Sequence, residues 1–253
     1  MERVNLFFLH GFLGRPSDWA AVKAHLPFSE ELRFFIPDYF KDPQLGPQHS
    51  LDVWAENFTK WVELNGCAGE RNILVGYSLG GRLALHALKR RPVLWHKAVL
   101  ISTNPGFNDL HESLNPISAE RQQRWMNDSY WAEEFQKSSW DMVLRNWNAQ
   151  PVFGGSEREP QRVEQDYSRE SLSLALTQWS LAQQVNMRPL LQSQLSKILW
   201  LVGERDTKFV ELSRRLEQEV PGLQMQLIFG ASHRVPFDNP KDLATFLSPF
   251  CKI

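Results

Sequence analysis

Short apolar runs alternate with helical patterns along most of the chain. Helical spacing of apolar residues is clear after Ser50, where Trp54 and Phe58 share one face. Asn239 followed by Pro240 is typical of a helix start and predicts a last helix. Continuously apolar runs predict strands covered on both faces, and they lie at residues 4–10, 33–37, 72–77, 98–102, 197–203 and 224–229. The alternation predicts an α/β fold, with a mostly parallel sheet and helices on both of its faces.

The alternation stops in the middle of the chain. Between residues 107 and 190 the pattern is helical and contains no convincing strand. We therefore predict a core formed by residues 1–106 and 191–253, with a helical lid at 107–190 inserted into it. A lid of this kind excludes water when it closes and completes the pocket beneath it.

Composition and charge exclude several classes of function. The chain has 253 residues and a formal net charge of −1, which provides no broad positive field for nucleic acid or an acidic membrane surface. Without a leader or membrane-spanning pattern, we expect a cytoplasmic protein with no membrane partner, either a monomer or a weak homo-oligomer. Cys67 and Cys251 form no disulfide framework, and neither they nor the histidines show metal-ligand spacing, so we expect no metal site.

One serine stands between a strand pattern and a helical pattern. The sequence from Gly76 to Gly80 reads G-Y-S-L-G, with Ser78 at its centre. In a nucleophile elbow such a serine lies on a tight strand-to-helix turn, and the glycines remove side chains that would clash there. The bare pattern also occurs in ordinary Gly/Ser turns, so the flanking strand and helix carry the prediction that Ser78 is catalytic.

A catalytic serine needs an imidazole to take its proton and an acid to orient that imidazole. In this chain order the acid follows a late strand and the histidine follows the last one. Asp206 comes just after the strand pattern at 197–203, and His233 just after the one at 224–229. Glu204 competes with Asp206 for the acid role, and we prefer Asp206.

Negative charge that develops in the reaction needs two backbone N–H donors, an oxyanion hole. One is expected from Leu79, directly after the serine. The other is expected from the loop after the first strand, where residues 10–14 read H-G-F-L-G and Phe12 is preferred. His10 is interpreted as a structural residue of that loop.

With these features in place, the chain resembles the α/β-hydrolase superfamily over nearly its whole length. Two further blocks are more specific: residues 146–153 read N-W-N-A-Q-P-V-F, and residues 203–209 read G-E-R-D-T-K-F. They are similar to motifs of the 2-succinyl-6-hydroxy-2,4-cyclohexadiene-1-carboxylate synthases of menaquinone biosynthesis. The resemblance implies a carbon–oxygen lyase that eliminates pyruvate from 2-succinyl-5-enolpyruvyl-6-hydroxy-3-cyclohexene-1-carboxylate without a cofactor. It also implies that Ser78 removes a ring proton rather than accepting an acyl group.

The implied small-molecule substrate carries several carboxylates, which guanidinium groups bind well. Arg82 lies one helical turn after Ser78 and is expected to face the same pocket. The resemblance implies that the substrate-binding set comprises Tyr77, Arg82, Arg124, Trp147 and Arg169, with Arg121 as a neighbour that exchanges roles with Arg124 if the alignment slips.

Other interpretations of the same residues stay open at this point. Any single lid arginine also fits a solvated surface, and we interpret Arg158 and Arg162 in that way. An ordinary serine hydrolase of ester or carbon–carbon bonds would use the same Ser, His and Asp, and an apolar pocket poor in arginine would favour it. A binding protein without catalysis is disfavoured because all three catalytic positions are filled.

Overall fold

The computed structural model describes residues 3–27, 29–108, 118–156 and 158–253. Its centre is one six-stranded sheet with the order β2-β1-β3-β4-β5-β6, and every neighbouring pair of strands is parallel. The strands are β1 (Val4–Leu9), β2 (Leu32–Phe35), β3 (Arg71–Tyr77), β4 (Lys97–Ile101), β5 (Ile198–Gly203) and β6 (Gln224–Ile228). All six predicted strands are confirmed, and their ends differ from the prediction by no more than about two residues, the usual uncertainty of such boundaries.

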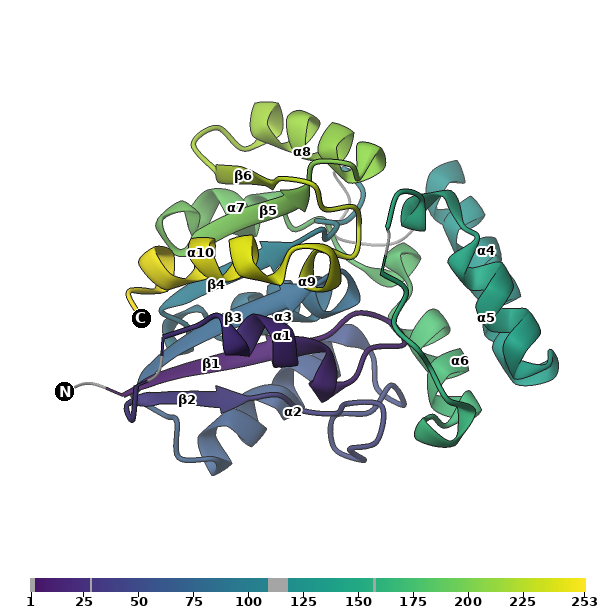
Figure 1. Cartoon of the computed structure of the whole chain (residues 1–253), viewed down its shortest axis with the longest axis horizontal. Coiled ribbons are helices and arrows are strands. Elements are labelled where there is room, and N and C mark those ends of the chain that lie inside the picture. The colour runs from purple at the N-terminus through teal and green to yellow at the C-terminus, as the bar shows by residue number, and fades with distance from the viewer. Residues whose placement is uncertain (1–2, 28, 109–117, 157) are drawn as a thin grey trace.

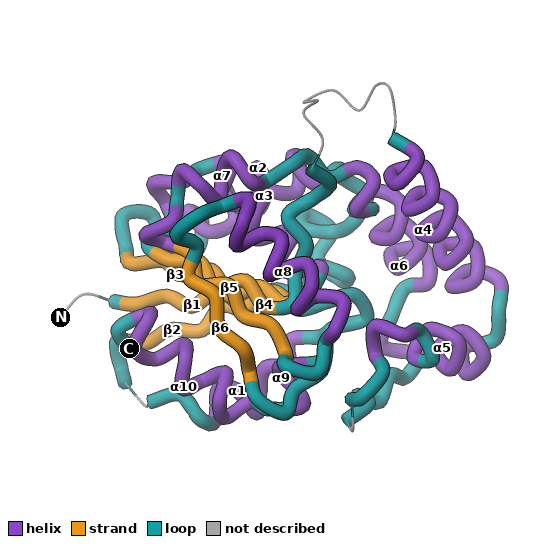
Figure 2. The backbone as a smooth tube through the Cα atoms, turned by 90° about the horizontal axis from the view of Figure 1, so that it is seen from above, coloured by secondary structure: helices purple, strands orange, loops and turns teal. Residues whose placement is uncertain are grey.

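Helices cover both faces of the sheet, as Figures 1 and 2 show. One face is covered by α2 (Leu51–Leu64), α3 (Leu79–Arg90), α7 (Arg188–Ser193) and α8 (Thr207–Glu219). The other face is covered by α1 (Ala20–Ala24), α9 (Val235–Asp238) and α10 (Pro240–Cys251). Short 3₁₀ turns join these elements: η1 (Pro16–Trp19), η2 (Pro92–Leu94), η3 (Pro151–Phe153), η4 (Glu164–Asp166), η5 (Leu181–Gln183) and η6 (Leu195–Lys197).

Alternation along the strands explains the two cores. Phe7 and Leu74 pack into the cluster under α2 and α3, whereas Phe8 and Val75 pack into the cluster under α1 and α10. Successive strand residues point to opposite faces, so a continuously apolar strand feeds both clusters. This is the arrangement that the sequence pattern predicts for a sheet covered on both sides.

The predicted helix starts have their capping residues in place. The Ser50 side chain accepts a hydrogen bond from the N–H of Val53 at the start of α2. The Asn239 side chain accepts one from the N–H of Asp242 at the start of α10, at 3.1 Å. Each contact satisfies a backbone donor that the first helical turn leaves without a partner.

A group of helices follows β4 and precedes β5, as predicted. It contains α4 (Ala119–Lys137), α5 (Trp140–Asn148) and α6 (Arg169–Gln178), and the described residues between these two strands contain no strand. Figure 1 places the group beyond the carboxyl ends of the strands. Residues 109–117 of the predicted lid lie outside the described residues, and the movement of this group as a lid stays a prediction. No helix in the described ranges is both long and apolar enough to cross a membrane.

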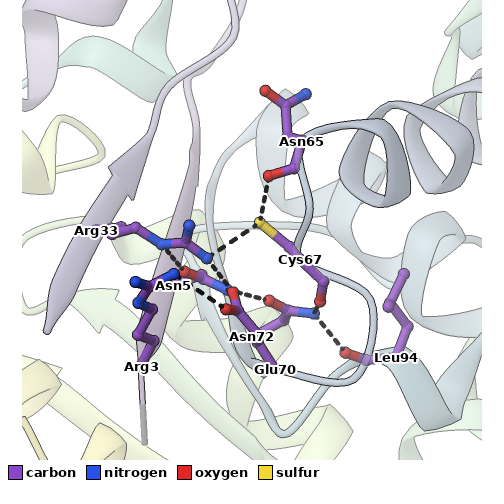
Figure 3. Close-up of polar contacts among 8 residues, drawn as sticks. All are labelled: Arg3, Asn5, Arg33, Asn65, Cys67, Glu70, Asn72 and Leu94. Atoms are coloured by element: carbon purple, nitrogen blue, oxygen red, sulfur yellow. Dashed lines mark hydrogen bonds and ion pairs between the residues drawn. The ribbon is translucent and has the colours of Figure 1, made fainter.

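A polar network fixes the opposite, amino-terminal end of the strands (Figure 3). Asn5 of β1 pairs in register with Asn72 of β3, and both side chains are fully buried. Asn5 Nδ2 donates to Asn72 Oδ1 at 2.7 Å, and Arg33 Nε of β2 donates to Asn5 Oδ1 at 2.7 Å. Asn72 Nδ2 in turn donates to the carbonyl oxygens of Cys67 and Leu94. Three neighbouring strands are therefore held in one register by side chains that satisfy each other.

Replacing Asn72 by leucine should lower the free energy of unfolding by about 3 kcal/mol, because the buried amide of Asn5 and the carbonyl groups of Cys67 and Leu94 each lose one hydrogen bond. Urea unfolding followed by circular dichroism measures this change. Asn65→Ala is the matched control, since its side chain is exposed and, within the described residues, donates to the carbonyl of Trp61 alone. Equal effects of the two substitutions would contradict the structural role of the network.

Candidate active site

Ser78 occupies the turn between β3 and α3 in a strained backbone conformation. Its φ of 53° and ψ of −113° lie outside the regions that non-glycine residues favour. Its N–H donates to the carbonyl of Ile101 at 2.9 Å, and its carbonyl accepts from the N–H of Arg82 at 3.2 Å. The Thr103 hydroxyl donates to the same carbonyl at 2.8 Å. These contacts from β4 and α3 hold the strained turn in place.

Gly80 allows the first turn of α3 to approach the end of β1. A Cβ atom at Gly80 would lie 2.5 Å from the carbonyl oxygen of His10 and closer still to that of Leu9. Both obstacles are backbone atoms, which do not move aside as a flexible side chain does. The loop that follows β1 is brought to the serine by this approach, since a Cβ at Gly11 would lie 3.6 Å from the Cβ of Ser78.

The three predicted catalytic side chains lie in one hydrogen-bonded line. His233 Nε2 is 3.1 Å from Ser78 Oγ, and His233 Nδ1 is 2.7 Å from Asp206 Oδ2. Asp206 and His233 are almost fully buried, and the ring of Phe209 lies 4.7 Å from the imidazole. Glu204, the alternative acid, is exposed and accepts a backbone N–H on the turn after β6. The line is suited to moving a proton from the hydroxyl to the imidazole.

The two backbone donors predicted for the oxyanion hole belong to two segments that meet at the serine turn. Leu79 is the first residue of α3, and Phe12 lies in the loop after β1. In the described part of the chain, neither N–H donates to another backbone carbonyl. Both are therefore available to a developing negative charge, and their role stays a prediction.

His10 supports this loop from beneath. It is buried, its Nδ1 donates to the carbonyl of Gly11 at 3.0 Å, and its ring stacks on Tyr39 at 4.0 Å. The Tyr39 hydroxyl donates to the carbonyl of His10. Burial lowers the pKa of His10 to about 4, so the ring is neutral at pH 7. These contacts fit the structural role that the sequence suggests.

A group of cations lies beside the serine turn. Arg82 Nη1 is buried and has no hydrogen-bond partner among the residues that the structure describes. Burial lowers the pKa of Arg82, and the nearby Arg124 charge lowers it further. Burial and Arg124 also lower the pKa of Lys208 on α8. A bound anion would relieve both the desolvation and the repulsion, so this region is suited to carboxylates.

The two arginines of α4 differ in their contacts, and substrate binding by either one stays a prediction. Arg124 lies near Arg82, and its Nε donates to Asp128 Oδ2 at 2.7 Å. Arg121 is only 2% exposed, and its Nη1 donates to two carbonyls of the segment around η5, those of residues 182 and 184. Of the pair, Arg124 is therefore the one that lies near Arg82. Arg121 joins α4 to the segment around η5 within the helical group.

Arg169 binds other parts of the helical group. Its Nη1 donates to the carbonyls of Phe135 and Ser138 at 3.0 and 2.7 Å, at the carboxyl end of α4. Its Nε donates to Glu164 at 2.6 Å. A cation at this position suits the last carbonyls of a helix. Substrate binding by Arg169 stays a prediction, and it would require the side chain to exchange these partners.

Of the two predicted aromatic residues, Tyr77 lies next to His233, and Trp147 packs on the loop after β1. Trp147 of α5 packs on Phe12 with 4.8 Å between ring centres, and on Trp131 with 5.0 Å. Tyr77 is buried, and its ring centre is 5.7 Å from that of His233. Burial raises the pKa of Tyr77. The helical group thus contacts the loop that carries the Phe12 N–H.

One buried cation next to the site was not predicted. Arg234 directly follows His233, and its Nη2 donates to Asn148 Oδ1 at the end of α5, at 2.6 Å. Its guanidinium lies 4.4 Å from the ring centre of Phe153. Burial lowers the pKa of Arg234. The loop that holds the imidazole is thereby joined to the helical group. The only feature of the sequence that could have indicated this contact is the position of Arg234 directly after His233.

The interpretation of Arg162 as surface charge is wrong. Its two Nη groups donate to the two carboxylate oxygens of Asp18 at 2.8 and 2.7 Å, and the side chains are 6% and 10% exposed. The pair joins the segment before η4 to the 3₁₀ turn after β1. Arg158, by contrast, is exposed, as the sequence suggests.

Among the described residues, no group of three or more His, Cys, Asp or Glu side chains is placed to hold a metal ion.

Residues 6–246 match the model of the alpha/beta hydrolase family. The 2-succinyl-6-hydroxy-2,4-cyclohexadiene-1-carboxylate synthase of Klebsiella pneumoniae subsp. pneumoniae is 30% identical over 239 residues, which cover 93% of this chain and 88% of the relative. This chain belongs to the α/β-hydrolase family and, within it, to the 2-succinyl-6-hydroxy-2,4-cyclohexadiene-1-carboxylate synthases.

Solved structures agree on the fold. MenH from S. aureus superposes with a TM-score of 0.82 at 22% identity, covering 99% of this chain and 93% of that one. A thermophilic esterase from Thermogutta terrifontis, with malate bound, superposes with a TM-score of 0.74 at 19% identity, covering 99% and 90%. At these identities the likeness speaks for the fold alone, which lyases and esterases share.

Replacing Gly80 by alanine should slow the reaction of Ser78 with a fluorophosphonate probe by about tenfold or more, because the added methyl pushes α3 away from the end of β1. Labelling kinetics followed by mass spectrometry measure the effect. Lys89→Ala, at an exposed position of the same helix, is the control. A folded Gly80→Ala variant that labels at the unchanged rate would show that this approach does not position the serine.

Proposed function

We propose that this protein eliminates pyruvate from 2-succinyl-5-enolpyruvyl-6-hydroxy-3-cyclohexene-1-carboxylate and so forms 2-succinyl-6-hydroxy-2,4-cyclohexadiene-1-carboxylate in menaquinone biosynthesis. It is then a carbon–oxygen lyase. Membership of the synthase family supports this function. The observation that carries it is the line from Ser78 through His233 to Asp206, next to Arg82, whose buried Nη1 has no hydrogen-bond partner among the described residues.

The names of substrate and product define the bonds that change. The ring proton at carbon 2 lies next to the ketone of the succinyl group and is therefore the acidic one. When it leaves, its electron pair forms the C2=C3 double bond, the C3=C4 pair moves to C4=C5, and the C5–O bond breaks. The enolpyruvate leaves with that oxygen, gains a proton and becomes pyruvate. The step is redox-neutral, and no atom is gained from water.

The catalytic line supplies the base for this step. His233 Nε2 accepts the hydroxyl proton of Ser78, so that Ser78 Oγ removes the proton from carbon 2. Asp206 stabilises the imidazolium that forms. The imidazolium then gives its proton to the departing enolpyruvate, and Ser78 ends as a hydroxyl without a covalent intermediate. The N–H groups of Leu79 and Phe12 would donate hydrogen bonds to the ketone oxygen and so stabilise the negative charge that develops on it.

The cations explain why this site suits elimination from a polyanion better than hydrolysis of an apolar ester. A serine hydrolase of ester or carbon–carbon bonds uses the same line of side chains, so the line alone does not separate the two functions. Arg82, Arg124 and Lys208 add positive charge that a neutral ester would leave unpaired. A substrate with three carboxylates satisfies this charge.

We also propose that the protein works in the cytoplasm on this small-molecule polycarboxylate, as a monomer or weak homo-oligomer. A polyanion does not partition into a bilayer, so enzyme and substrate must share an aqueous compartment. No nucleic acid takes part in the proposed reaction.

Replacing Ser78 by alanine should reduce pyruvate release from the enolpyruvyl substrate by about 10³-fold or more, because the base is lost while the binding groups remain. Pyruvate is followed by coupling to lactate dehydrogenase. Ser193→Ala, a distant serine on α7, should leave the rate unchanged. A wild-type protein that cleaves p-nitrophenyl esters briskly but leaves the enolpyruvyl substrate intact would refute the lyase function.

Replacing Arg82 by methionine should lower kcat/KM by an amount equivalent to about 2–5 kcal/mol, because a desolvated contact to a substrate carboxylate is lost. Steady-state kinetics measure this, and an effect below about threefold would argue against a contact. Arg169→Met is the informative comparison. A rise in its KM would support its predicted substrate contact, whereas a loss of thermal stability alone would assign it to the helical group.

A further inference from the structure

Asp128 is a buried carboxylate that the proposed reaction does not use. It lies on α4 one turn after Arg124 and is only 2% exposed. Its Oδ2 accepts from Arg124 Nε at 2.7 Å and from Ser180 Oγ at 2.7 Å. Burial of a carboxylate costs free energy unless partners compensate for the lost hydration. A buried carboxylate beside Arg82, Arg124 and Lys208 calls for a physical explanation.

Asp128 holds Arg124 by the inner nitrogen of the guanidinium. Arginine pairs with carboxylates most strongly through two parallel N–H groups, as Arg162 does with Asp18. Here the hydrogen bond uses Nε, and no residue within the described ranges is hydrogen-bonded to either Nη of Arg124. The Arg124 side chain is 33% exposed. Its outer nitrogens are therefore oriented and still free to bind an anion.

Ser180 fixes the carboxylate from the other side. It is buried, its hydroxyl donates to Asp128, and it accepts from the N–H of Ala182 at the start of η5 at 3.0 Å. Arg121 of α4 holds the same segment through the carbonyls of Ala182 and Gln184. The Asp128 carboxylate is thus fixed between its own helix, α4, and the segment around η5. Because Asp128 is held in place, it also restricts the orientation of Arg124.

The charge of Asp128 also acts on the neighbouring cations. Burial and Arg124 lower the pKa of Arg82, whereas Asp128 raises it. Burial and Arg124 lower the pKa of Lys208, and Asp206 and Asp128 raise it. Arg82, Arg124 and Lys208 are therefore all close enough to the Asp128 carboxylate to interact with its charge. The group keeps a positive excess for a substrate, while Asp128 reduces the repulsion that would separate its members.

We propose that Asp128 is a positioning residue of an anion subsite: it orients Arg124 so that the outer nitrogens of Arg124, together with Arg82, bind carboxylates of the substrate. Asp128 itself does not touch the substrate in this arrangement. The proposal rests on the proposed function for the identity of the substrate. Its physical content is that a carboxylate in a cationic site strengthens anion binding, because orientation outweighs the charge that it cancels.

Two substitutions separate orientation from charge. Asp128→Ala removes both, and it should raise KM for the enolpyruvyl substrate about tenfold or more while kcat changes less than about threefold. Asp128→Asn keeps the shape and a carbonyl oxygen that accepts the Arg124 Nε–H, so it should restore most of the lost affinity. Simple charge cancellation predicts the reverse, because removing the negative charge would then tighten binding of the anion in both variants.

A double-mutant cycle tests whether Asp128 acts through Arg124. In an Arg124→Met background, Asp128→Ala should change KM by less than about twofold, because the side chain that it positions is already absent. Additive effects of the two substitutions would overturn the proposal. Thermal unfolding of each variant accompanies the kinetics, and Asp128→Asn serves as the folded reference if Asp128→Ala is unstable.

Binding of succinate, measured by isothermal titration calorimetry at low salt, makes the test independent of turnover. We expect Asp128→Ala to weaken succinate binding about tenfold, and Asp128→Asn to weaken it much less. If the wild type releases no pyruvate but this pattern holds, the proposed function fails and the anion subsite stands. If the wild type releases pyruvate and Asp128→Ala matches it in KM and succinate affinity, the positioning role fails and the function stands.

Discussion

The close approach of α3 to the end of β1 is the contact on which the rest of the site depends. Gly80 permits it, because any side chain there would collide with the backbone of Leu9 and His10. The approach brings the loop that contains Phe12 next to Ser78, which Leu79 directly follows in the chain. The parallel sheet brings the other two side chains to the same place, because β5 and β6 end at the same edge. His233 reaches the Ser78 hydroxyl, and Asp206 is hydrogen-bonded to the other nitrogen of the imidazole.

In the function that we propose, the helical group gives this general-purpose arrangement its specificity. It meets the core through Trp147 on Phe12 and through Arg234, whose guanidinium reaches Asn148 from the loop that carries the catalytic imidazole. From α4 it contributes Arg124, which lies near Arg82 of the core. A proton transfer from carbon is helped by a base that is shielded from water and by fixed positive charge nearby. The same positive charge also binds a polyanion.

The sequence predicts the fold and the meeting of Ser78, His233 and Asp206 well, because both depend on order along the chain. Each apolar run marks a strand, and the residues after β3, β5 and β6 must meet at one edge of a parallel sheet. Side-chain partners far apart in sequence follow no such rule. Arg121 and Arg124 are one turn apart on α4, and it is the packing of distant segments, among them η5, that buries Arg121. Arg162 carries no signal that it pairs with Asp18, 144 positions away.

The account depends on a serine that removes a proton and forms no bond to the substrate. The most direct test is the intact mass of the enzyme, quenched at short intervals during turnover of the enolpyruvyl substrate, with pyruvate and diene measured in the same samples. The account predicts an unmodified mass at every time point, with pyruvate and diene formed in equal amounts. A transient adduct on the peptide that contains Ser78, formed and lost at the rate of turnover, would contradict it.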